Sequence, residues 1–594
     1  MSADAPSDPG PWGQLGELPE RVNMAAFLVD RAREAPDAPA IRVARGVGAG
    51  LTFADTTYAE LERTSGVLAA ALAAEGLGPG DRVSVFVKPG VELIALVFAL
   101  LRMGAVPVLI DPGMGPRSVL SCVERMAPKA FLGIPLAHVL RRLKPKAFRT
   151  VELDVVAAGG GGRLVAALTG ARTTAGLLAA HAHAERPLRD THRDDPAAIL
   201  FTSGSTGPPK GVAYTHGMFE AQVRALKATY DMRPGEVDVA CLPVFALFSP
   251  ALGMTCVFPE LDPSKPATCD PARIADAIRA SGATTTFGSP AIWRRVVPHC
   301  LETGKDLSGL RRVLIAGAPV PADLLADLRS LLGPDGDVHT PYGATESLPV
   351  STLSGAELLT EDAGALRARS ETGDGTCVGR PVPGIELELV RITDEPLAAW
   401  SDDLRVPDGA LGEVVVRGPV VTAEYVSESG HTADAKVPVP ADRAHHPGEV
   451  MHRIGDLARR DPDGRLWFHG RKSHRLETAD GLVMPVPVEN VVNTHPAVAR
   501  CALVGVGPSG AERQVLVVRP EAEAWPVDRR AGADLAAALF EHVADQPVCA
   551  GVERILFRRE LPVDVRHNAK IHRGELKVWA EAQGEPDGPE GHGR

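Results

Sequence analysis

The segment from residue 197 to residue 216 has the residue types and spacing of a phosphate-binding site. It reads AAILFTSGSTGPPKGVAYTH, beginning with an apolar run (Ala197–Phe201) typical of a buried strand. Farther on, Phe219, Val223, Leu226 and Tyr230 recur at helical spacing. Between these two elements lie glycines, hydroxyl residues and one lysine, with candidate ligands Thr202, Ser203, Gly204, Ser205, Thr206, Gly207 and Lys210. Glycines let backbone N–H groups approach an anion, hydroxyls donate hydrogen bonds, and an ammonium adds a point charge. The pattern therefore predicts a strand, a phosphate loop and a helix.

Two other interpretations of this loop fit less well. A Walker A loop requires Gly-Lys-Ser/Thr four residues after Gly204, but the chain has Pro209, Lys210 and Gly211 there. A flexible linker rarely contains Pro-Pro-Lys or lies between a buried strand and an amphipathic helix. A phosphate loop of another class remains the best interpretation.

The elements that must position this loop follow an alternating pattern. From Val83 onward, short apolar runs alternate with longer amphipathic ones, as in VSVFV, ELIALVFALLRM, VPVLI, SVLSCVERM and AFLGI. This alternation is typical of βαβ units and predicts an α/β fold with parallel sheets sandwiched between helices. After Leu411 short strands predominate, and a compact αβ region runs from Glu477 to about Ala580.

Composition excludes several classes of protein. The 594 residues include 63 basic and 75 acidic side chains, a net charge of −12, which argues against nucleic acid as the main partner. At roughly 150 residues per domain, this length predicts several structural units. Only 12 of the basic residues are lysines and 51 are arginines, so each lysine is more informative than usual.

The cysteines and the apolar segments predict a cytoplasmic protein that is not an integral membrane protein. The eight cysteines form no CxxC pair and are expected to be buried thiols of a reducing compartment. The N-terminal residues lack the basic and apolar regions of a signal peptide. The apolar stretch Leu93–Ile110 is interrupted by Arg102, Gly104 and Pro107, which favours a buried helix followed by a strand over a membrane span.

The phosphate loop is one of nine motifs that resemble, in the same order, those of the adenylate-forming superfamily. That superfamily includes acyl-CoA synthetases, luciferases and nonribosomal peptide adenylation domains. The other motifs are GAVPVLIDPG (104–113), FGSPA (287–291), LIAGAPV (314–320), YGATE (342–346), GEVVVRGP (412–419), IGD (454–456), GRKSHR (470–475) and NAKIHR (568–573). The resemblance implies a large N-terminal AMP-binding domain (21–470) that includes a β-barrel-like subdomain, and a small mobile α+β lid (471–580). The tails 1–20 and 581–594 are expected to be disordered.

The resemblance also implies roles for individual residues, with ATP and Mg²⁺ as cofactors. An adenine slot would be formed by Gly317, Ala318, Pro319 and Tyr342, followed in the same motif by Gly343 and Ala344. Thr345 resembles the residue that binds the α-phosphate, Glu346 the Mg²⁺ ligand, and Asp456 with Arg471 the ribose site. Lys570 occupies the place of the C-terminal catalytic lysine, and Lys210 with Glu346 would hold the leaving pyrophosphate.

Departures from the common motifs narrow the reaction class. Ala246 replaces the histidine of most acyl-CoA synthetases, Ile454 the threonine of TGD, and Ala569 the glycine before the catalytic lysine. Ser473 takes the position of the lid hinge, which is usually aspartate. The segments CLPVFALFSPALGM, TPYGATESLPV, RLWFHGRKSHRLET and VDVRHNAKIHR resemble one branch, the β-lactone synthetases of bacterial olefin and β-lactone pathways.

Membership of that branch implies adenylation of a 2-alkyl-3-hydroxy fatty acid, after which its own hydroxyl displaces AMP to give a β-lactone. His567 and His216 are candidate bases for the hydroxyl proton, although packing or capping is the better interpretation of both. The run Phe245–Met254, with Phe287 and Ile292, is expected to line an alkyl pocket or to be core. Thiolase-like and reductase enzymes are possible pathway partners. The alternatives are a fatty-acyl-CoA or acyl-carrier ligase, and a nucleotide-binding regulator without turnover.

Overall fold

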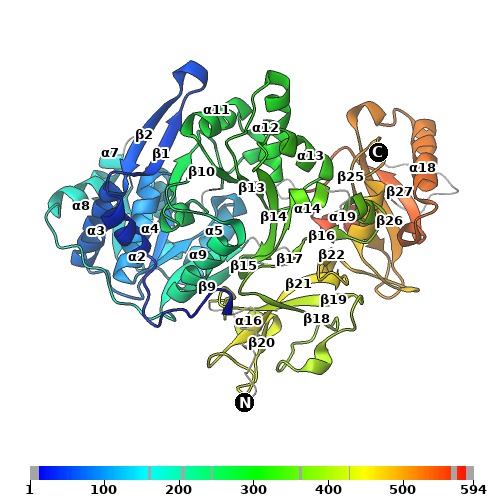
Figure 1. Ribbon diagram of the computed structural model, residues 1–594. Helices are drawn as coiled ribbons and strands as arrows, with labels where there is room; N and C mark the ends of the chain where they lie inside the picture. The colour runs from blue at the N-terminus through cyan, green and yellow to red at the C-terminus, as the bar shows by residue number, and fades with distance from the viewer. Residues whose placement is uncertain are drawn as a thin grey trace, which may run out of the picture.

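The computed structural model describes residues 13–157, 162–202, 208–242, 245–359, 364–426, 429–563 and 571–583. Two large, mainly parallel sheets form the body of the molecule, an antiparallel sheet lies below them in Figure 1, and a small α+β unit lies at the right. The predicted α/β fold is therefore confirmed. The predictions for Ser203–Gly207, His567, Ala569, Lys570, residues 1–12 and residues 584–594 lie outside the described residues.

The first large sheet has seven strands in the order β7-β6-β5-β3-β4-β8-β9. All its pairs are parallel except β8 with β9, at one edge. The strands are β3 (Arg82–Phe86), β4 (Val106–Leu109), β5 (Ala130–Gly133), β6 (Leu153–Val156), β7 (Arg172–Thr173), β8 (Pro196–Thr202) and β9 (Lys210–Thr215). The apolar run at 93–110 forms a buried helix and strand, as predicted from its interruptions.

The second large sheet has nine strands in the order β17-β15-β14-β13-β12-β10-β11-β1-β2. Its central pairs are parallel and its edges antiparallel. The strands are β1 (Pro39–Arg45), β2 (Thr52–Thr57), β10 (Val237–Ala240), β11 (Thr255–Phe258), β12 (Thr285–Gly288), β13 (Arg312–Ile315), β14 (Asp337–Ala344), β15 (Ser347–Ser354) and β17 (Arg380–Pro381).

Helices cover the faces of both sheets (Figure 1). They bury apolar side chains in two clusters: a larger one on α3 and α4, extending to Phe287, and a second around Trp293 on α12. The helices of this part are α2 (Ala26–Glu34), α3 (Tyr58–Ala74), α4 (Val91–Met103), α5 (Pro116–Met126), α6 (Pro135–Leu143), α7 (Gly162–Thr169), α8 (Thr174–Ala180), α9 (His216–Tyr230), α10 (Phe248–Ala251), α11 (Pro271–Ser281), α12 (Pro290–Thr303), α13 (Ala322–Ser330), α14 (Gly355–Leu359) and α15 (Gly364–Glu371).

The antiparallel sheet occupies the place of the expected β-barrel-like subdomain. Its strands run in the order β16-β22-β21-β19-β18, with β20 paired to β21. The bounds are β16 (Thr376–Cys377), β18 (Glu386–Val390), β19 (Gly412–Arg417), β20 (Lys436–Pro438), β21 (Val450–Arg460) and β22 (Leu466–Arg471), and α16 (Ser429–Ala435) precedes β20. The predicted domain boundary after residue 470 falls at the end of β22.

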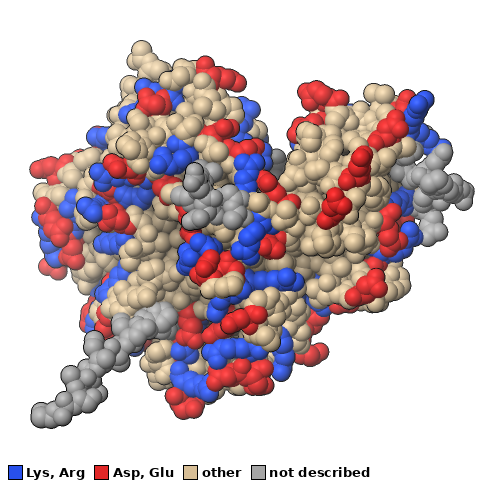
Figure 2. Space-filling model, turned by 45° about the vertical axis from the view of Figure 1, so that its right-hand side comes forward, with Lys and Arg blue, Asp and Glu red and all other residues tan. Residues whose placement is uncertain are grey.

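The C-terminal unit combines a short hairpin, a three-stranded sheet and three helices. Its elements are β23 (Leu476–Thr478), β24 (Gly481–Val483), α17 (Pro485–Val492), β25 (Val498–Val506), β26 (Arg513–Pro520), α18 (Arg529–Val543), β27 (Val552–Phe557) and α19 (Arg573–Ala582). Its own apolar clusters, such as that around Leu503 and Leu516, indicate a separate core. Figure 2 shows a hollow between this unit, on the right, and the larger part.

Three further observations bear on the expectations from composition. All eight cysteines are buried and unpaired. In the part of the chain that the structure describes, every helix is too short or too polar to cross a bilayer. Acidic and basic side chains are intermingled over the face in Figure 2, as the scattered basic residues in the sequence suggested.

Candidate active site

The phosphate loop connects two strands of a hairpin. Lys210 is the first residue of β9 and pairs with Thr202, the last residue of β8. The predicted order of strand, loop and helix is therefore wrong by one element, because a second strand precedes α9. Val212 and Tyr214 alternate into the core beside Ala198, and this alternation extends the chain up to Thr215, whose hydroxyl caps α9. The helix N-terminus is thus one strand length away from the predicted loop.

The predicted ribose site brings three side chains together at the edge of the antiparallel sheet. Asp456 on β21 and Arg471 on β22 are paired in register, and Arg471 Nε lies 3.0 Å from Asp456 Oδ1. The Tyr342 hydroxyl donates to Asp456 Oδ2 at 2.6 Å. The Asp456 side chain is only 5% exposed, and the pKa of Arg471 is raised mainly by this carboxylate. Two contacts, from Arg471 and Tyr342, therefore fix the carboxylate in orientation.

The predicted adenine slot lies at the carboxyl ends of neighbouring parallel strands. Gly317–Pro319 follow β13, and Tyr342 lies near the end of β14, its parallel neighbour. Gly317 has a φ of 95°, which favours glycine in this turn. At Gly343 an added Cβ would lie 2.7 Å from the Ser347 carbonyl oxygen, so the turn from β14 to β15 requires glycine. Small residues and one aromatic ring thus meet at this edge, as a purine-binding slot needs.

The predicted metal ligand, Glu346, lies in the same turn and is almost fully buried. The Tyr425 hydroxyl donates to Glu346 Oε1 at 2.6 Å, and the backbone N–H of Thr422 donates to the Glu346 carbonyl at 2.9 Å. The carbonyl of Thr345, beside it, accepts from the Tyr214 hydroxyl. Over the described ranges Glu346 makes no ion pair, so its charge is available to a cation. A single carboxylate of this kind suits Mg²⁺, which completes its shell with water and phosphate oxygens.

A buried lysine, Lys436, completes this group and was missed in the sequence. Its ammonium donates to the carbonyl and, at 3.2 Å, to the hydroxyl of Thr422, and it lies 5.7 Å from the centre of the Tyr425 ring. Lys210 Nζ lies 5.1 Å from the same ring. We call Lys210, Glu346, Thr422, Tyr425 and Lys436 the lysine–tyrosine cluster.

Burial dominates the electrostatics of Lys436. Burial lowers its pKa from 10.5 to about 7, although the field of Glu346 raises it. The neighbouring His452 is fully buried and its pKa is lowered well below the usual value, first by burial and then by Lys436. The scarcity of lysine was a signal for Lys436, but Lys436 lies in none of the recognised motifs.

His216, one of the two candidate bases, is a packing residue in this structure. It is completely buried, and its Nδ1 accepts from the backbone N–H of Met24 at 3.1 Å. Burial lowers its pKa to about 4. The structure therefore favours the packing interpretation, and His216 is not presented to a substrate.

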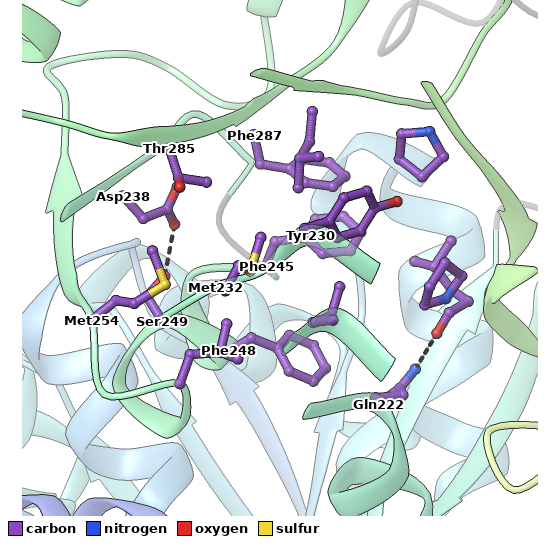
Figure 3. A pocket seen from close by; sticks show the side chains of 16 residues that line it. Gln222, Tyr230, Met232, Asp238, Phe245, Phe248, Ser249, Met254, Thr285 and Phe287 are labelled. Atoms are coloured by element: carbon purple, nitrogen blue, oxygen red, sulfur yellow. Dashed lines mark hydrogen bonds between the residues drawn. The ribbon is translucent and has the colours of Figure 1, made fainter. Parts of the chain in front are cut away.

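A narrow, partly open apolar pocket with a cavity volume of about 50 Å³ lies between α9, β10 and β12 (Figure 3). Its walls are aromatic and aliphatic side chains, including Leu226, Tyr230, Met232, Phe245, Phe248, Leu252, Met254, Phe287 and Leu314. The rings of Phe245 and Phe287 stack with centroids 3.9 Å apart. Their position agrees with the predicted pocket, whereas Ile292 follows the other expectation for this set, which was core packing. Ile292 packs with Trp293 and Val296 in the second core cluster, because α12 turns it away from the pocket.

The predicted hinge is bound by two cationic neighbours to β19 and to the loop between β18 and β19. Ser473 lies in a short 3₁₀ turn (Lys472–His474). Lys472 Nζ lies 3.1 Å from Glu413 on β19, and Arg475 forms an ion pair with Asp394 at 2.5 Å. The backbone around Ser473 is therefore held in place on both sides, and the role of Ser473 as a hinge stays a prediction.

Comparison with known proteins identifies close relatives of this chain. A family model described as "AMP-binding enzyme" matches residues 28–426. The olefin beta-lactone synthetase of Xanthomonas campestris pv. campestris is 44% identical over 96% of this chain and 100% of its own length. That of Stenotrophomonas maltophilia is 45% identical over 94% of this chain and 98% of its own length.

Solved structures resemble the fold at lower identity. The crystal structure of an anthranilate CoA ligase in complex with anthranoyl-AMP matches with a TM-score of 0.74 and 20% identity. The match covers 96% of this chain and 99% of that one. At this identity the likeness establishes the fold alone, which is that of the adenylate-forming enzymes.

Proposed function

This chain belongs to the family of AMP-binding enzymes, and from that premise we propose that it is an ATP-dependent β-lactone synthetase. The observation that carries the proposal is its 44–45% identity, over nearly the whole chain, to two olefin beta-lactone synthetases. The apolar lining of the pocket beside the nucleotide-side residues supports a substrate with an alkyl chain. The proposed reaction converts a 2-alkyl-3-hydroxy fatty acid and ATP into a β-lactone, AMP and pyrophosphate.

The residues around β13, β14 and β21 would hold ATP. We propose that the adenine lies between Gly317–Pro319 and Tyr342, and that Asp456 accepts hydrogen bonds from the ribose hydroxyls beside Arg471. The phosphates would face Thr345 and the hairpin loop from Thr202 to Lys210. Glu346 would hold Mg²⁺, which when bound neutralises charge on the phosphates.

In the first half-reaction a substrate carboxylate oxygen attacks the α-phosphorus. The new C–O–P bond forms as the bond to the β-phosphate oxygen breaks, giving an acyl-adenylate and pyrophosphate. Both reactants are anions, so catalysis depends on positioning and on positive charge near the transition state. Lys210 on the pyrophosphate side and Lys570 beside the carboxylate and α-phosphate are the proposed sources of that charge.

In the second half-reaction the substrate's 3-hydroxyl oxygen attacks the acyl carbon. A C–O bond of the four-membered ring forms, the bond from the acyl carbon to the AMP oxygen breaks, and the hydroxyl proton passes to a base. The nucleophile is part of the same molecule, so only its orientation must be fixed. Of the two histidines considered as the base, the burial of His216 leaves His567 as the candidate.

The chemistry of the substrate indicates which enzymes must act before this one, and the cysteines indicate the compartment. A 2-alkyl-3-hydroxy acid must be supplied by a condensation of two acyl chains followed by reduction of a 3-keto group, so we propose association with thiolase-like and reductase enzymes. The eight unpaired cysteines support a cytoplasmic location.

The test is incubation of the purified enzyme with ATP, Mg²⁺ and a racemic 2-alkyl-3-hydroxy acid, with and without coenzyme A. We expect lactone and AMP in equal amounts without coenzyme A, measured by mass spectrometry and nucleotide chromatography. A Lys570→Ala variant should lose acid-dependent pyrophosphate release. A strict requirement for coenzyme A, with a thioester as product, would contradict the proposal and identify an acyl-CoA ligase. Binding of ATP without formation of AMP or pyrophosphate would instead identify a nucleotide-binding regulator.

A further inference from the structure

Besides Gln222, which donates to the Leu348 carbonyl, the wall of the apolar pocket holds a buried polar group that the proposed reaction does not use. Asp238 on β10, Ser249 on α10 and Thr285 on β12 lie together in its wall (Figure 3). All three are buried, with exposed fractions of 7%, 2% and 2%. Asp238 and Thr285 are register partners on adjacent parallel strands, so both side chains point to the same face of the sheet.

The hydrogen bonds of this group are incomplete. The Ser249 hydroxyl donates to Asp238 Oδ2 at 2.7 Å. Asp238 Oδ1 and the Thr285 hydroxyl, in contrast, have no hydrogen-bond partner among the described residues. Buried polar atoms without a partner are rare, because they lose their hydrogen bonds to water and gain no replacement. An acceptor and a hydroxyl thus face the pocket side by side, both lacking a partner.

The Asp238 carboxylate has no ion pair in the described ranges. The Arg312 guanidinium, whose field lowers the pKa of Asp238, is itself bound to Glu236 at 3.1 Å. Burial raises the pKa of Asp238 to about 6, so at neutral pH the carboxylate form prevails and acts as an acceptor. A ligand that donates a hydrogen bond to the Asp238 carboxylate would stabilise this buried charge, which the apolar side chains of the wall cannot do.

The position of the group separates it from the reacting atoms. Gly317 and Tyr342 lie at the carboxyl ends of the central parallel strands, whereas Asp238 and Thr285 lie near the amino ends. At about 3.3 Å per residue, Thr285 lies about 10 Å before the end of β12 at Gly288. The 3-hydroxyl must be close to the acyl carbon, so it is not the group that meets Asp238.

We propose that Asp238 and Thr285 bind a second hydroxyl, carried on the alkyl chain of the substrate several carbons from the carboxylate. That hydroxyl would donate to Asp238 Oδ1 and accept from the Thr285 hydroxyl, which satisfies both atoms at once. The proposal rests on the proposed function, in that the pocket holds the acyl chain. The substrate class is then a 2-alkyl-3-hydroxy acid with an additional alcohol on its chain.

The experiment uses a series of 2-alkyl-3-hydroxy acids of one chain length that differ only in the position of an additional hydroxyl, with the unsubstituted acid as reference. Both acid-dependent pyrophosphate release and lactone formation are measured for the full-length enzyme. We expect kcat/KM to peak at one hydroxyl position, about tenfold or more above the reference. Asp238→Leu and Thr285→Val, made separately, should abolish the peak, and Asp238→Asn, which keeps an acceptor, should retain part of it.

The matched control is Thr286→Val. Thr286 is the next residue on β12, and its hydroxyl donates to the Val239 carbonyl at 2.9 Å, away from the pocket. This variant should keep the preference. Equal rates for every acid with the wild-type enzyme, or a preference that survives Asp238→Leu and Thr285→Val, would overturn the proposal and leave a buried water as the partner of both atoms. Because pyrophosphate release reports chain selectivity whatever the acyl acceptor, absence of lactone would contradict the proposed function without removing this test.

Discussion

The lysine–tyrosine cluster and the apolar pocket both place a buried charged group beside a proposed substrate. The two regions differ in how many hydrogen bonds the chain gives to that charged group. In the cluster, Lys436 is bound to Thr422, Thr422 to the Glu346 backbone, and Tyr425 to the Glu346 carboxylate. In the pocket, the Asp238 side chain has one hydrogen bond to the described residues, from Ser249, and the other lining side chains are mainly apolar. The cluster is held rigid by the chain itself, as phosphate chemistry requires, whereas the pocket leaves contacts for a ligand to complete.

The largest effect is expected from removing the charge at the centre of the cluster. Glu346→Gln keeps an oxygen to accept from Tyr425 but abolishes the anionic ligand proposed for Mg²⁺. We expect pyrophosphate release to fall by about 100-fold or more at saturating ATP. The matched control is Glu424→Gln, an exposed position one residue before Tyr425, which should leave the rate unchanged. Equal rates for both variants would show that the cluster does not hold the metal.

An intermediate effect is expected for Lys436→Met, which removes the buried ammonium and leaves Glu346 in place. Thr422 would lose an anchor, so the Glu346 turn should be held less firmly. We expect kcat to fall by about tenfold, with a higher Mg²⁺ requirement and an unchanged KM for the acid. Lys146→Met, at a lysine whose side chain is 84% exposed, is the control. A change in acid KM alone would contradict this positioning role.

Lys436 should also have a signature in stability against pH. Its folded-state pKa of about 7 lies below its ordinary value of 10.5, so between these values the unfolded chain binds a proton that the folded chain does not. The free energy of unfolding of the wild type, relative to Lys436→Met, should therefore increase as the pH rises from 7 to 10.5. Urea unfolding of both proteins at several pH values measures this difference, and parallel curves would show that Lys436 remains charged when folded.

The smallest effect is expected in the pocket wall, where shape rather than charge decides. Leu226→Trp, on the face of α9 that lines the pocket, should shorten the alkyl chain that is preferred. We expect a loss of about fivefold in kcat/KM for long chains and little change for short ones, since one or two methylenes contribute only about 1–3 kcal/mol. A kinetic series over chain length checks this, with the exposed Leu143→Trp as control. Uniform loss at all lengths would indicate damage to the fold instead.

Sequence patterns predicted the architecture well where local signals were strong. The apolar alternation after Val83 predicted the βαβ units, and the interruptions in 93–110 predicted α4 and β4. The extra strand β9 was missed because helical spacing begins soon after the loop and conceals the short alternation around Val212 and Tyr214. The sequence left Ile292 open between pocket and core, because periodicity identifies a buried side of a helix but not the sheet or pocket that it faces.

The candidate site likewise contains residues that sequence motifs identify and residues that only the structure reveals. Motifs in the sequence identified Tyr342, Glu346, Asp456 and Arg471. In the structure Tyr342 and Arg471 both contact Asp456, and Glu346 forms a separate group with Tyr425. Lys436 and Asp238 carry no motif, so only their burial and partners reveal them. Their neighbours come from distant parts of the chain, as with Thr285 beside Asp238.

By itself, the sequence determined the family, the alternation of strands and helices after Val83, and the types of residue at the nucleotide side, because these depend on local spacing and on contiguous motifs. Only the tertiary structure decided which charges are buried together. Whether a lysine is solvated or has its pKa lowered, and whether an aspartate is paired or left facing a pocket, depends on groups far apart in the chain. Desolvation is a property of the packed interior, and it is therefore absent from any single segment.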